Sequence, residues 1–250
     1  MKSRYPLHQN GTVSEWDARL RISSELTMFL PVSRRQEWQR VTTDGTSTLG
    51  HHVESLGIPL TEVGPMLAEG RGVPPSYLLA PGDVVEVGPV PRPQPLPDEP
   101  RFLLDVHLGT LARRLRLLGI DAAYHNDMDD PALVVQANEE RRVLLTQDRG
   151  LLRRRALWLG AYVRGSRPAD QLRDLLQRFA PPLRPWTRCT ACNGELEPVA
   201  KQEVEPLLEA GTQRTYDVYG RCERCGQVYW RGAHSDHLEK IISQARAWTS

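Results

Sequence analysis

The strongest chemical signal in the sequence is a set of four cysteines arranged as two C-x-x-C pairs. Cys189 and Cys192 form the first pair, and Cys222 and Cys225 form the second, with 29 residues between the pairs. Two such pairs, with Gly226 directly after the second, are typical of a tetrahedral zinc–thiolate site. Four thiolates leave no open coordination position, so we expect a structural zinc ion. Two disulfides are the alternative, which a reducing compartment disfavours.

A second signal is a group of acids that follow predicted strands or precede a predicted helix. Asp105 and Asp148 each end a short apolar run, and Asp129 and Asp130 close an acidic stretch before a helix. Acids at the ends of neighbouring parallel strands meet at one edge of a sheet, where open α/β folds bind ligands. Carboxylates suit Mg²⁺ or Mn²⁺, and such an ion activates water for attack on a phosphodiester. These four acids are therefore our candidate catalytic residues.

Each acid also has a structural interpretation that the residues alone leave open. Asp130 stands before Pro131 and has the character of a helix N-cap. Asp105 and Asp148 are in place to cap the helices that follow them. We expect Asp121 to lie at the surface or to act as a cap.

Arginines accompany the acids at both strand ends. Arg113, Arg114 and Arg116 lie on the predicted helix after Asp105, and Arg149 and Arg153 follow Asp148. Residues 101–180 hold 14 basic and 10 acidic side chains, although the net charge of the whole chain is only +1. These five arginines are predicted to contact a nucleic-acid backbone. The alternative for each of them is an ordinary solvated helix face.

The elements that must position these residues follow from hydrophobic periodicity. In residues 101–180, short apolar runs alternate with helical patterns, which predicts an α/β domain with a parallel sheet. The expected strands are 101–105, 120–125, 141–148 and 156–165, and the expected helices are 107–119, 130–140, 149–157 and 167–179. Residues 14–90 show strands at 18–23, 38–44 and 81–90 and helices at 24–31 and 46–57, an order compatible with a β-grasp fold.

Between these two regions the sequence is rich in proline. Prolines stand at positions 89, 91, 93, 95, 97 and 100, which predicts an extended, semi-rigid linker over 91–100. No run of about 18 apolar residues occurs, so we expect no membrane association. The first residues lack an apolar core after their charges, so we expect no secretory signal and a cytoplasmic location.

Several of these motifs, in this order, resemble the Mut-seven C-terminal RNase family. The resembling stretches are FLLDVHLGTLARRLRLLGIDAAYHNDMDDPAL, RRVLLTQDRGLLRRR, CTACNGEL and CERCGQVYWRGAH, within residues 101–238. The family combines a PIN-like nuclease domain with a zinc ribbon, often behind a ubiquitin-like domain. Gln147 departs from the arginine that is common at this position, and His107 and Ser235 also depart from the usual residues.

The resemblance implies a domain order and a metal-dependent ribonuclease. It divides the chain into a ubiquitin-like β-grasp domain (14–90), the linker (91–100), a PIN-like nuclease domain (101–180) and a zinc ribbon (185–238). It implies Asp105, Asp148 and one or both of Asp129 and Asp130 as catalytic acids, with Asp105, Asp130 and Asp148 holding Mg²⁺ or Mn²⁺. The zinc ligands would be the four cysteines.

Two other functions stay open at this stage. The chain would alternatively be an RNA- or ribosome-associated binding factor with little catalysis, or its β-grasp domain would recruit a protein partner. The RNA class, whether tRNA, rRNA or mRNA, is not indicated. His234 and His237 follow the second cysteine pair, and we expect both at the surface.

Overall fold

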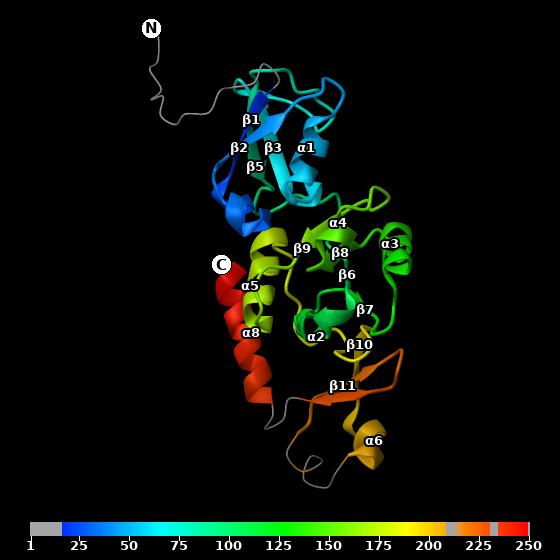
Figure 1. Ribbon diagram of the computed structural model, residues 1–250. Coiled ribbons are helices and arrows are strands. Elements are labelled where there is room, and N and C mark those ends of the chain that lie inside the picture. Colours follow the sequence, from blue (N-terminus) through cyan, green and yellow to red (C-terminus); the bar gives the residue numbers. More distant parts are fainter. Residues whose placement is uncertain (1–16, 209–213, 215, 231–234, 250) are drawn as a thin grey trace. The chain divides into compact units, whose positions relative to one another are not determined.

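A computed structural model describes residues 17–208, 214, 216–230 and 235–249 (Figure 1). The chain divides into two compact units, with the break between Val90 and Pro91. Each unit has its own sheet and its own buried residues, and each is described separately below. Among the described residues, no helix has the length and apolar character needed to cross a bilayer.

The first unit is a β-grasp fold, as expected. Its mixed sheet has the order β2-β1-β5-β3-β4, in which β1 and β5 are parallel and the other pairs are antiparallel. The strands are β1 (Asp17–Ile22), β2 (Trp38–Thr42), β3 (Val63–Ala68), β4 (Arg71–Gly72) and β5 (Val84–Pro89). The helical segments are α1 (Leu49–Ser55) and the 3₁₀ turns η1 (Ser24–Phe29), η2 (Val32–Arg34) and η3 (Leu60–Glu62).

Local signals explain most of this unit, and two features differ from expectation. Helix α1 begins where Thr48 accepts a hydrogen bond from the His51 backbone N–H at 3.2 Å, and it ends before Gly57, whose φ is +97°. The expected helix at 24–31 is instead a 3₁₀ turn whose cap makes no side-chain hydrogen bond. Strands β3 and β4 were not predicted, because Gly64 and Pro65 interrupt the β3 pattern where its register shifts.

The second unit contains a fully parallel sheet of order β7-β6-β8-β9. Its strands are β6 (Phe102–Leu104), β7 (Ala122–Tyr124), β8 (Val143–Thr146) and β9 (Gly160–Tyr162). They alternate with α2 (Gly109–Leu117), α3 (Asp130–Glu139), α4 (Arg149–Leu152) and α5 (Pro168–Phe179), and the turn η4 (Val106–Leu108) precedes α2. The predicted α/β class is therefore confirmed.

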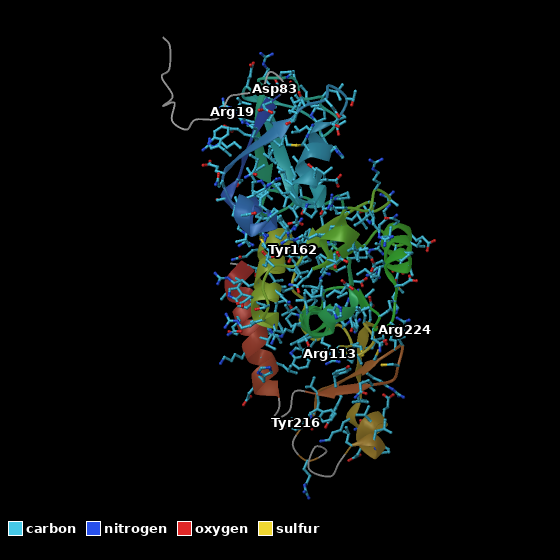
Figure 2. All side chains as sticks on the ribbon, in the orientation of Figure 1. Arg19, Asp83, Arg113, Tyr162, Tyr216 and Arg224 are labelled. Carbon is cyan, nitrogen blue, oxygen red and sulfur yellow. The ribbon has the colours of Figure 1, made fainter. Side chains whose placement is uncertain are left out.

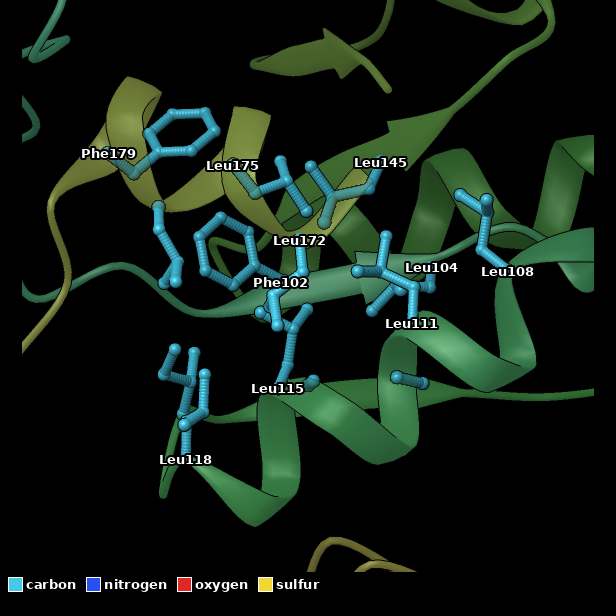
Figure 3. Packing of buried hydrophobic residues seen from close by; sticks show 14 of the residues in the cluster. Phe102, Leu104, Leu108, Leu111, Leu115, Leu118, Leu145, Leu172, Leu175 and Phe179 are labelled. Atoms are coloured by element: carbon cyan, nitrogen blue, oxygen red, sulfur yellow. The ribbon is translucent and has the colours of Figure 1, made fainter. Parts of the chain in front are cut away.

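Helices cover both faces of this sheet, because successive strand residues point to opposite sides. Phe102 and Leu104 of β6 pack in one cluster with residues of α2 and α5, as Figure 3 shows. Leu103, between them, packs in a second cluster with residues of α3 and α4. Phe102 and Phe179 meet edge to face, with ring centroids 5.2 Å apart. This two-sided burial explains why the strands read as continuous apolar runs.

The C-terminal part adds a small antiparallel sheet and one further helix. The sheet has the order β10-β11-β12, from β10 (Leu196–Val199), β11 (Tyr219–Cys222) and β12 (Val228–Trp230), with α6 (Lys201–Val204) and η5 (Glu205–Leu207) after β10. Helix α8 (Ser235–Thr249) then runs beside α5 (Figure 1) and buries Ile241, Ile242 and Ala245 in the same cluster as Phe102. Helix α8 is not among the predicted elements, and the expected ribbon boundary at residue 238 falls inside it.

The proline-rich segment is part of the second unit rather than a free spacer. Arg92 forms an ion pair with Asp174 of α5, with 2.7 Å between Nη1 and Oδ1. Gln94 and Arg178 exchange two hydrogen bonds: the Gln94 N–H donates to the Arg178 carbonyl at 2.6 Å, and Arg178 Nε donates to Gln94 Oε1 at 2.8 Å. Proline removes backbone donors but leaves these side chains available, so the extended segment is fastened along α5.

Gly119, just after α2, allows close packing of the helix end on the segment that leads into the first cysteine pair. Its φ is +78°, and a Cβ there would lie 2.0 Å from the Arg184 carbonyl oxygen. We expect Gly119→Ala to lower the free energy of unfolding by about 2–5 kcal/mol, through left-handed strain and overpacking together. Chemical denaturation measures this change.

Gly226→Ala is the matched control for this substitution. Gly226 also has a positive φ, +72°, but a Cβ there meets nothing within 4 Å. We expect Gly226→Ala to lower the free energy of unfolding by about 1–2 kcal/mol, from left-handed backbone strain alone. Equal losses in the two variants would contradict the packing argument.

Candidate active site and metal centre

Two carboxylates stand where adjacent parallel strands end. Asp105 directly follows β6, and Asp148 comes two residues after the end of β8. From β6 the chain crosses to β7 on one side and later to β8 on the other. Such a reversal of strand order opens the crevice in which open α/β sheets bind ligands. The structure therefore places both acids at the carboxyl-end edge of the sheet, where the strand order reverses.

The hydroxyl of Thr146 joins the two acids. Thr146 is the last residue of β8 and is fully buried. Its Oγ1 donates to Asp105 Oδ2 at 2.6 Å and accepts from the Asp148 backbone N–H at 2.9 Å. Because the hydroxyl has one proton, accepting from the N–H directs that proton to Asp105. The strand that carries Asp148 thus orients the carboxylate of Asp105.

Both acids also cap the helical turns that follow them, which the structural interpretation anticipated. Asp105 Oδ1 accepts from the Val106 N–H at 2.6 Å, and Asp148 Oδ1 accepts from the Gly150 N–H at 2.6 Å. A cap needs one oxygen, so the role is compatible with ligand binding. Within the described chain, the second oxygen of Asp148 has no hydrogen-bond partner.

The cap of α3 falls on Asp129, which corrects the expectation that Asp130 would be the cap. Asp129 Oδ1 accepts from the Ala132 N–H at 2.9 Å, and Asp130 is already the first helical residue. The backbone N–H groups of the first helical turn have no partner inside the helix, so Pro131 fits the second helical position as well as the first. The helix therefore begins at Asp130, one residue earlier than expected. The Asp130 carboxylate instead lies 3.2 Å from the guanidinium of Arg154.

The four candidate acids do not all converge. Among the described residues, the cysteines form the one group of three or more His, Cys, Asp or Glu side chains close enough to hold a single ion. Thr146 connects Asp105 with Asp148, whereas neither Asp129 nor Asp130 completes a three-acid cluster with them.

Gln147, the departure from the family pattern, has a structural role. Its Nε2 donates to the carbonyl oxygens of Val163 at 2.9 Å and Gly165 at 2.8 Å. These carbonyls belong to the segment between β9 and α5. Gln147 therefore fastens the end of β8 to a neighbouring loop, and these bonds do not involve the acids.

Four of the five candidate RNA-contacting arginines lie where solvent reaches them. Arg113 (labelled in Figure 2) and Arg153 are exposed, and Arg114 and Arg149 are half-buried. Arg116 is the exception, because it is only 4% exposed. Its predicted phosphate contact is therefore corrected to a structural role.

The guanidinium of Arg116 binds the first cysteine pair to the parallel sheet. Its Nη1 donates to the carbonyls of Ala191 at 2.7 Å and Thr190 at 3.2 Å, between Cys189 and Cys192. Its Nε donates to the carbonyl of Ala122 in β7 at 2.8 Å. One buried side chain thus ties α2, β7 and the cysteine loop together.

Asn193 and Asp121 complete this attachment. Asn193 Oδ1 accepts from the Ala122 N–H at 3.0 Å, and its Nδ2 donates to Asp121 Oδ1 at 2.7 Å. Asp121 also pairs with Arg142 at 2.6 Å, so it is not the simple surface or capping residue that we expected. Burial alone would raise the pKa of Asp121, but the hydrogen bonds from Arg142 and Asn193 outweigh it and lower that pKa.

The four cysteines converge as predicted. Cys189 Sγ lies 3.7 Å from Cys225 Sγ, Cys192 Sγ lies 3.5 Å from Cys222 Sγ, and all four sulfurs lie within 4.8 Å of one another. Disulfides require about 2.05 Å. A tetrahedron with metal–sulfur bonds of about 2.3 Å has sulfur–sulfur edges of about 3.8 Å. The donor set and its spacing therefore fit a structural metal ion such as zinc.

Backbone conformation and one phenol shape this cluster. A left-handed residue follows each pair, Asn193 with φ +68° and Gly226 with φ +72°. The Tyr229 hydroxyl lies 3.1 Å from Cys189 Sγ. Burial raises the pKa of the Cys189 thiol, but hydrogen bonds from Tyr229 and from the Cys192 backbone lower it to about 7 overall. Of the two nearby histidines, His237 is exposed as expected, and His234 lies outside the described residues.

We expect Arg116→Met to destabilise the second unit strongly. Three carbonyls lose their donor in a buried site, which costs about 2–4 kcal/mol of unfolding free energy. Arg113→Met, on the exposed side of the same helix, should change it by less than about 0.5 kcal/mol. Denaturation with zinc present compares the two variants, and similar stabilities would refute the structural role of Arg116.

We expect one zinc ion per chain in the purified protein. Cys225→Ser should lose it even though Cys225 is exposed, because the site needs all four thiolates. Tyr229→Phe is the control, since this residue contacts Cys189 without being a ligand. Metal analysis of each variant decides, and full zinc in Cys225→Ser would exclude a four-cysteine site.

Comparison with known families agrees with this geometry. A family model for the Mut7-C RNAse domain matches residues 100–242, and one for the Mut7-C ubiquitin domain matches residues 16–95. No curated protein and no solved structure gives a significant match. The first model spans more than half of the 250 residues and includes the acids, the arginines and the cysteine cluster. The chain therefore belongs to the Mut7-C RNAse domain family and carries that family's ubiquitin domain ahead of it.

Proposed function

We propose that the protein is a metal-dependent ribonuclease whose reaction centre lies at the carboxyl ends of β6 and β8. The observation that carries this proposal is the pair Asp105 and Asp148, joined through Thr146, in a chain of an RNase-domain family. Their carboxylate oxygens suit Mg²⁺ or Mn²⁺, with Asp129 or Asp130 as the third acidic ligand. When bound, a divalent ion supplies Lewis-acid activation of water and neutralises charge at the phosphate.

The residues of the chain would prepare this centre. Thr146 donates a hydrogen bond to Asp105 and so fixes the direction of its carboxylate. Asp148 uses one carboxylate oxygen to cap α4, and this bond holds the side chain in place. Its other oxygen is available for a ligand. Closely held carboxylates repel each other, and a bound cation relieves that repulsion.

Arginines near the two strand ends would hold the RNA backbone. Arg113 and Arg114 lie on α2, and Arg149 and Arg153 lie in or beside α4. Guanidinium groups suit phosphate because they donate in a planar fork. The zinc ribbon (185–238) would stiffen the C-terminal part and extend the RNA-binding surface of the nuclease domain (101–180).

The ubiquitin-like domain (14–90) would serve a different purpose, recruitment of a protein partner. We place the protein in the cytoplasm, with tRNA, rRNA or mRNA as substrate and the ribosome as a further candidate partner. Deletion of residues 1–90 would then lose the partner and keep RNA cleavage.

A second candidate function is RNA binding with little catalysis. It is favoured by one observation: neither Asp129 nor Asp130 completes a three-acid cluster with Asp105 and Asp148 in the described structure. If the protein is a nuclease, removal of Asp105 abolishes RNA cleavage. If it is a binding factor, removal of Asp105 leaves RNA binding unchanged.

The test is cleavage of total cellular RNA with added Mn²⁺ or Mg²⁺. We expect discrete fragments with wild type and a loss of at least about a hundredfold in rate with Asp105→Asn. Thr146→Val should also lose activity, because the carboxylate loses its positioning hydroxyl, while Thr146→Ser keeps most of it. Asp98→Asn, an exposed acid outside the site, is the control.

RNA ends mapped after cleavage identify the target. Absence of cleavage by wild type with either ion, together with unchanged RNA binding in Asp105→Asn, would support the binding factor instead.

A further inference from the structure

The turn that carries Asp105 is tied to the strands on both sides of β6. Thr146, the last residue of β8, donates its hydroxyl proton to Asp105 Oδ2 at 2.6 Å. Tyr124 is the last residue of β7, and its hydroxyl donates to the backbone carbonyl of Val106 at 2.8 Å. Thr146 already belongs to the proposed reaction centre, and Tyr124 makes the corresponding contact from the other neighbouring strand.

Hydrophobic packing fixes the two ends of this turn. Leu104 before it and Leu108 after it are buried in the cluster that contains Phe102, as Figure 3 shows. Asp105 and Val106, between these anchors, are only half-buried. Their orientation therefore depends on hydrogen bonds more than on packing.

Val106 is held at both of its backbone polar groups. Its N–H donates to Asp105 Oδ1 at 2.6 Å, and its carbonyl accepts from Tyr124. A rotation of Val106 would move the donor that directs Asp105 Oδ1. The two oxygens of this carboxylate are thus directed by different strands, Oδ2 by Thr146 of β8 and Oδ1, through Val106, by Tyr124 of β7. An ionised carboxylate has about four acceptor sites, so these bonds leave positions for a cation.

Gly109, the first residue of α2, makes room for the phenol. A Cβ at this position would lie 2.9 Å from both Cζ and the hydroxyl oxygen of Tyr124. The φ of Gly109 is −58°, an ordinary helical value, so the backbone conformation does not require glycine here. Glycine forms helices less well than alanine does. The space that the ring of Tyr124 occupies is therefore the physical reason for this glycine.

We propose that Tyr124 is a positioning residue that holds Asp105 in the orientation for binding a divalent ion. Its hydroxyl fixes Val106, and the Val106 N–H in turn fixes Asp105 Oδ1. The inference rests on the proposed function, because a divalent ion beside Asp105 belongs to that proposal. Tyr124 acts through the turn and contributes no ligand atom of its own.

The first experiment measures the affinity of the zinc-loaded, full-length protein for Mn²⁺ by electron paramagnetic resonance. A partner that contacts a metal ligand directly is worth about tenfold to a hundredfold in metal affinity. Tyr124 acts one residue further away, so we expect Tyr124→Phe to weaken Mn²⁺ binding about three- to tenfold. The Mn²⁺ concentration for half-maximal RNA cleavage should rise by the same factor, while the rate at saturating Mn²⁺ changes less than about twofold.

Tyr219→Phe is the matched control. The Tyr219 hydroxyl also donates to a backbone carbonyl at 2.8 Å, that of Tyr216, but it belongs to the small antiparallel sheet. Its loss should leave the Mn²⁺ affinity unchanged. Gly109→Ala should weaken Mn²⁺ binding as Tyr124→Phe does, because the added Cβ displaces the phenol. Helix propensity alone would predict that alanine improves this position.

A double variant shows whether Tyr124 acts through Asp105. In Asp105→Asn, the further change Tyr124→Phe should not alter the residual Mn²⁺ binding, because the carboxylate that Tyr124 positions is already gone. A further loss as large as in the wild-type background would overturn the proposed route through Val106.

Amide hydrogen exchange of Val106, followed by NMR without added Mn²⁺ or Mg²⁺, tests the contact independently of metal and of cleavage. We expect Tyr124→Phe to accelerate this exchange about three- to tenfold, since the turn opens more easily. Tyr219→Phe should not change it. Zinc content and thermal unfolding confirm that each variant is folded.

The outcomes separate this inference from the proposed function. Unchanged Mn²⁺ affinity in folded Tyr124→Phe, in a protein whose wild type binds Mn²⁺ and cleaves RNA, overturns the positioning role and leaves the nuclease standing. Weakened Mn²⁺ binding in Tyr124→Phe, in a protein whose wild type cleaves nothing, supports the positioning role and removes the nuclease. Faster Val106 exchange without any Mn²⁺ binding by wild type would make the contact purely structural and overturn both.

Discussion

A nearly buried positive charge holds the second unit together. All three hydrogen bonds that Arg116 donates go to neutral carbonyls, although the side chain is nearly inaccessible to solvent. Burial lowers the pKa of Arg116, and the nearby Cys189, Cys192 and Asp121 act in the opposite direction. Four thiolates carry more charge than a divalent ion, so a loaded site stays negative and compensates the guanidinium. The metal centre and the parallel sheet therefore stabilise each other.

This arrangement changes the meaning of the domain divisions. The cysteine loop is attached to α2 by the Arg116 side chain and to the backbone of β7 by the Asn193 side chain. Helix α8 returns to the cluster that contains Phe102. The proline-rich segment, too, is fastened along α5. The family match from 100 to 242 covers sheet, cysteine cluster and the start of α8 as one domain. The second unit is thus one compact structure, and the small antiparallel sheet lies between α5 and α8 in the chain order.

Much of the fold was predictable, because its signals are local. The strands of the parallel sheet are short apolar runs, and Gly57 and Gly119 mark helix ends where a positive φ is needed. Strand β3 was missed because Gly64 and Pro65 break its alternation. Helix α8 lies outside the prediction, although Leu238, Ile241 and Ile242 have helical spacing, because the motif expected for the cysteine pairs extends over the start of this helix.

The candidate site was only partly accessible from sequence. Spacing alone identified the cysteine cluster, because C-x-x-C fixes the geometry of its own loop. The positions of Asp105 and Asp148 follow from their strands, but the link through Thr146 depends on side-chain direction across two strands. Arg116 shares its helix with Arg113, and only tertiary packing decides that one is buried and the other exposed.

The return of α8 has a consequence for synthesis and folding. Helix α5 ends at Phe179, and its partner α8 begins at Ser235, so their contact closes a loop that contains both cysteine pairs. A growing chain emerges with the part of α5 that contacts α8 uncovered until α8 has been made. Metal uptake by the cysteines shortens the effective loop that must close, which lowers its entropic cost. Zinc supply would therefore govern how long the nascent chain exposes an aggregation-prone surface, and with it the yield of folded protein.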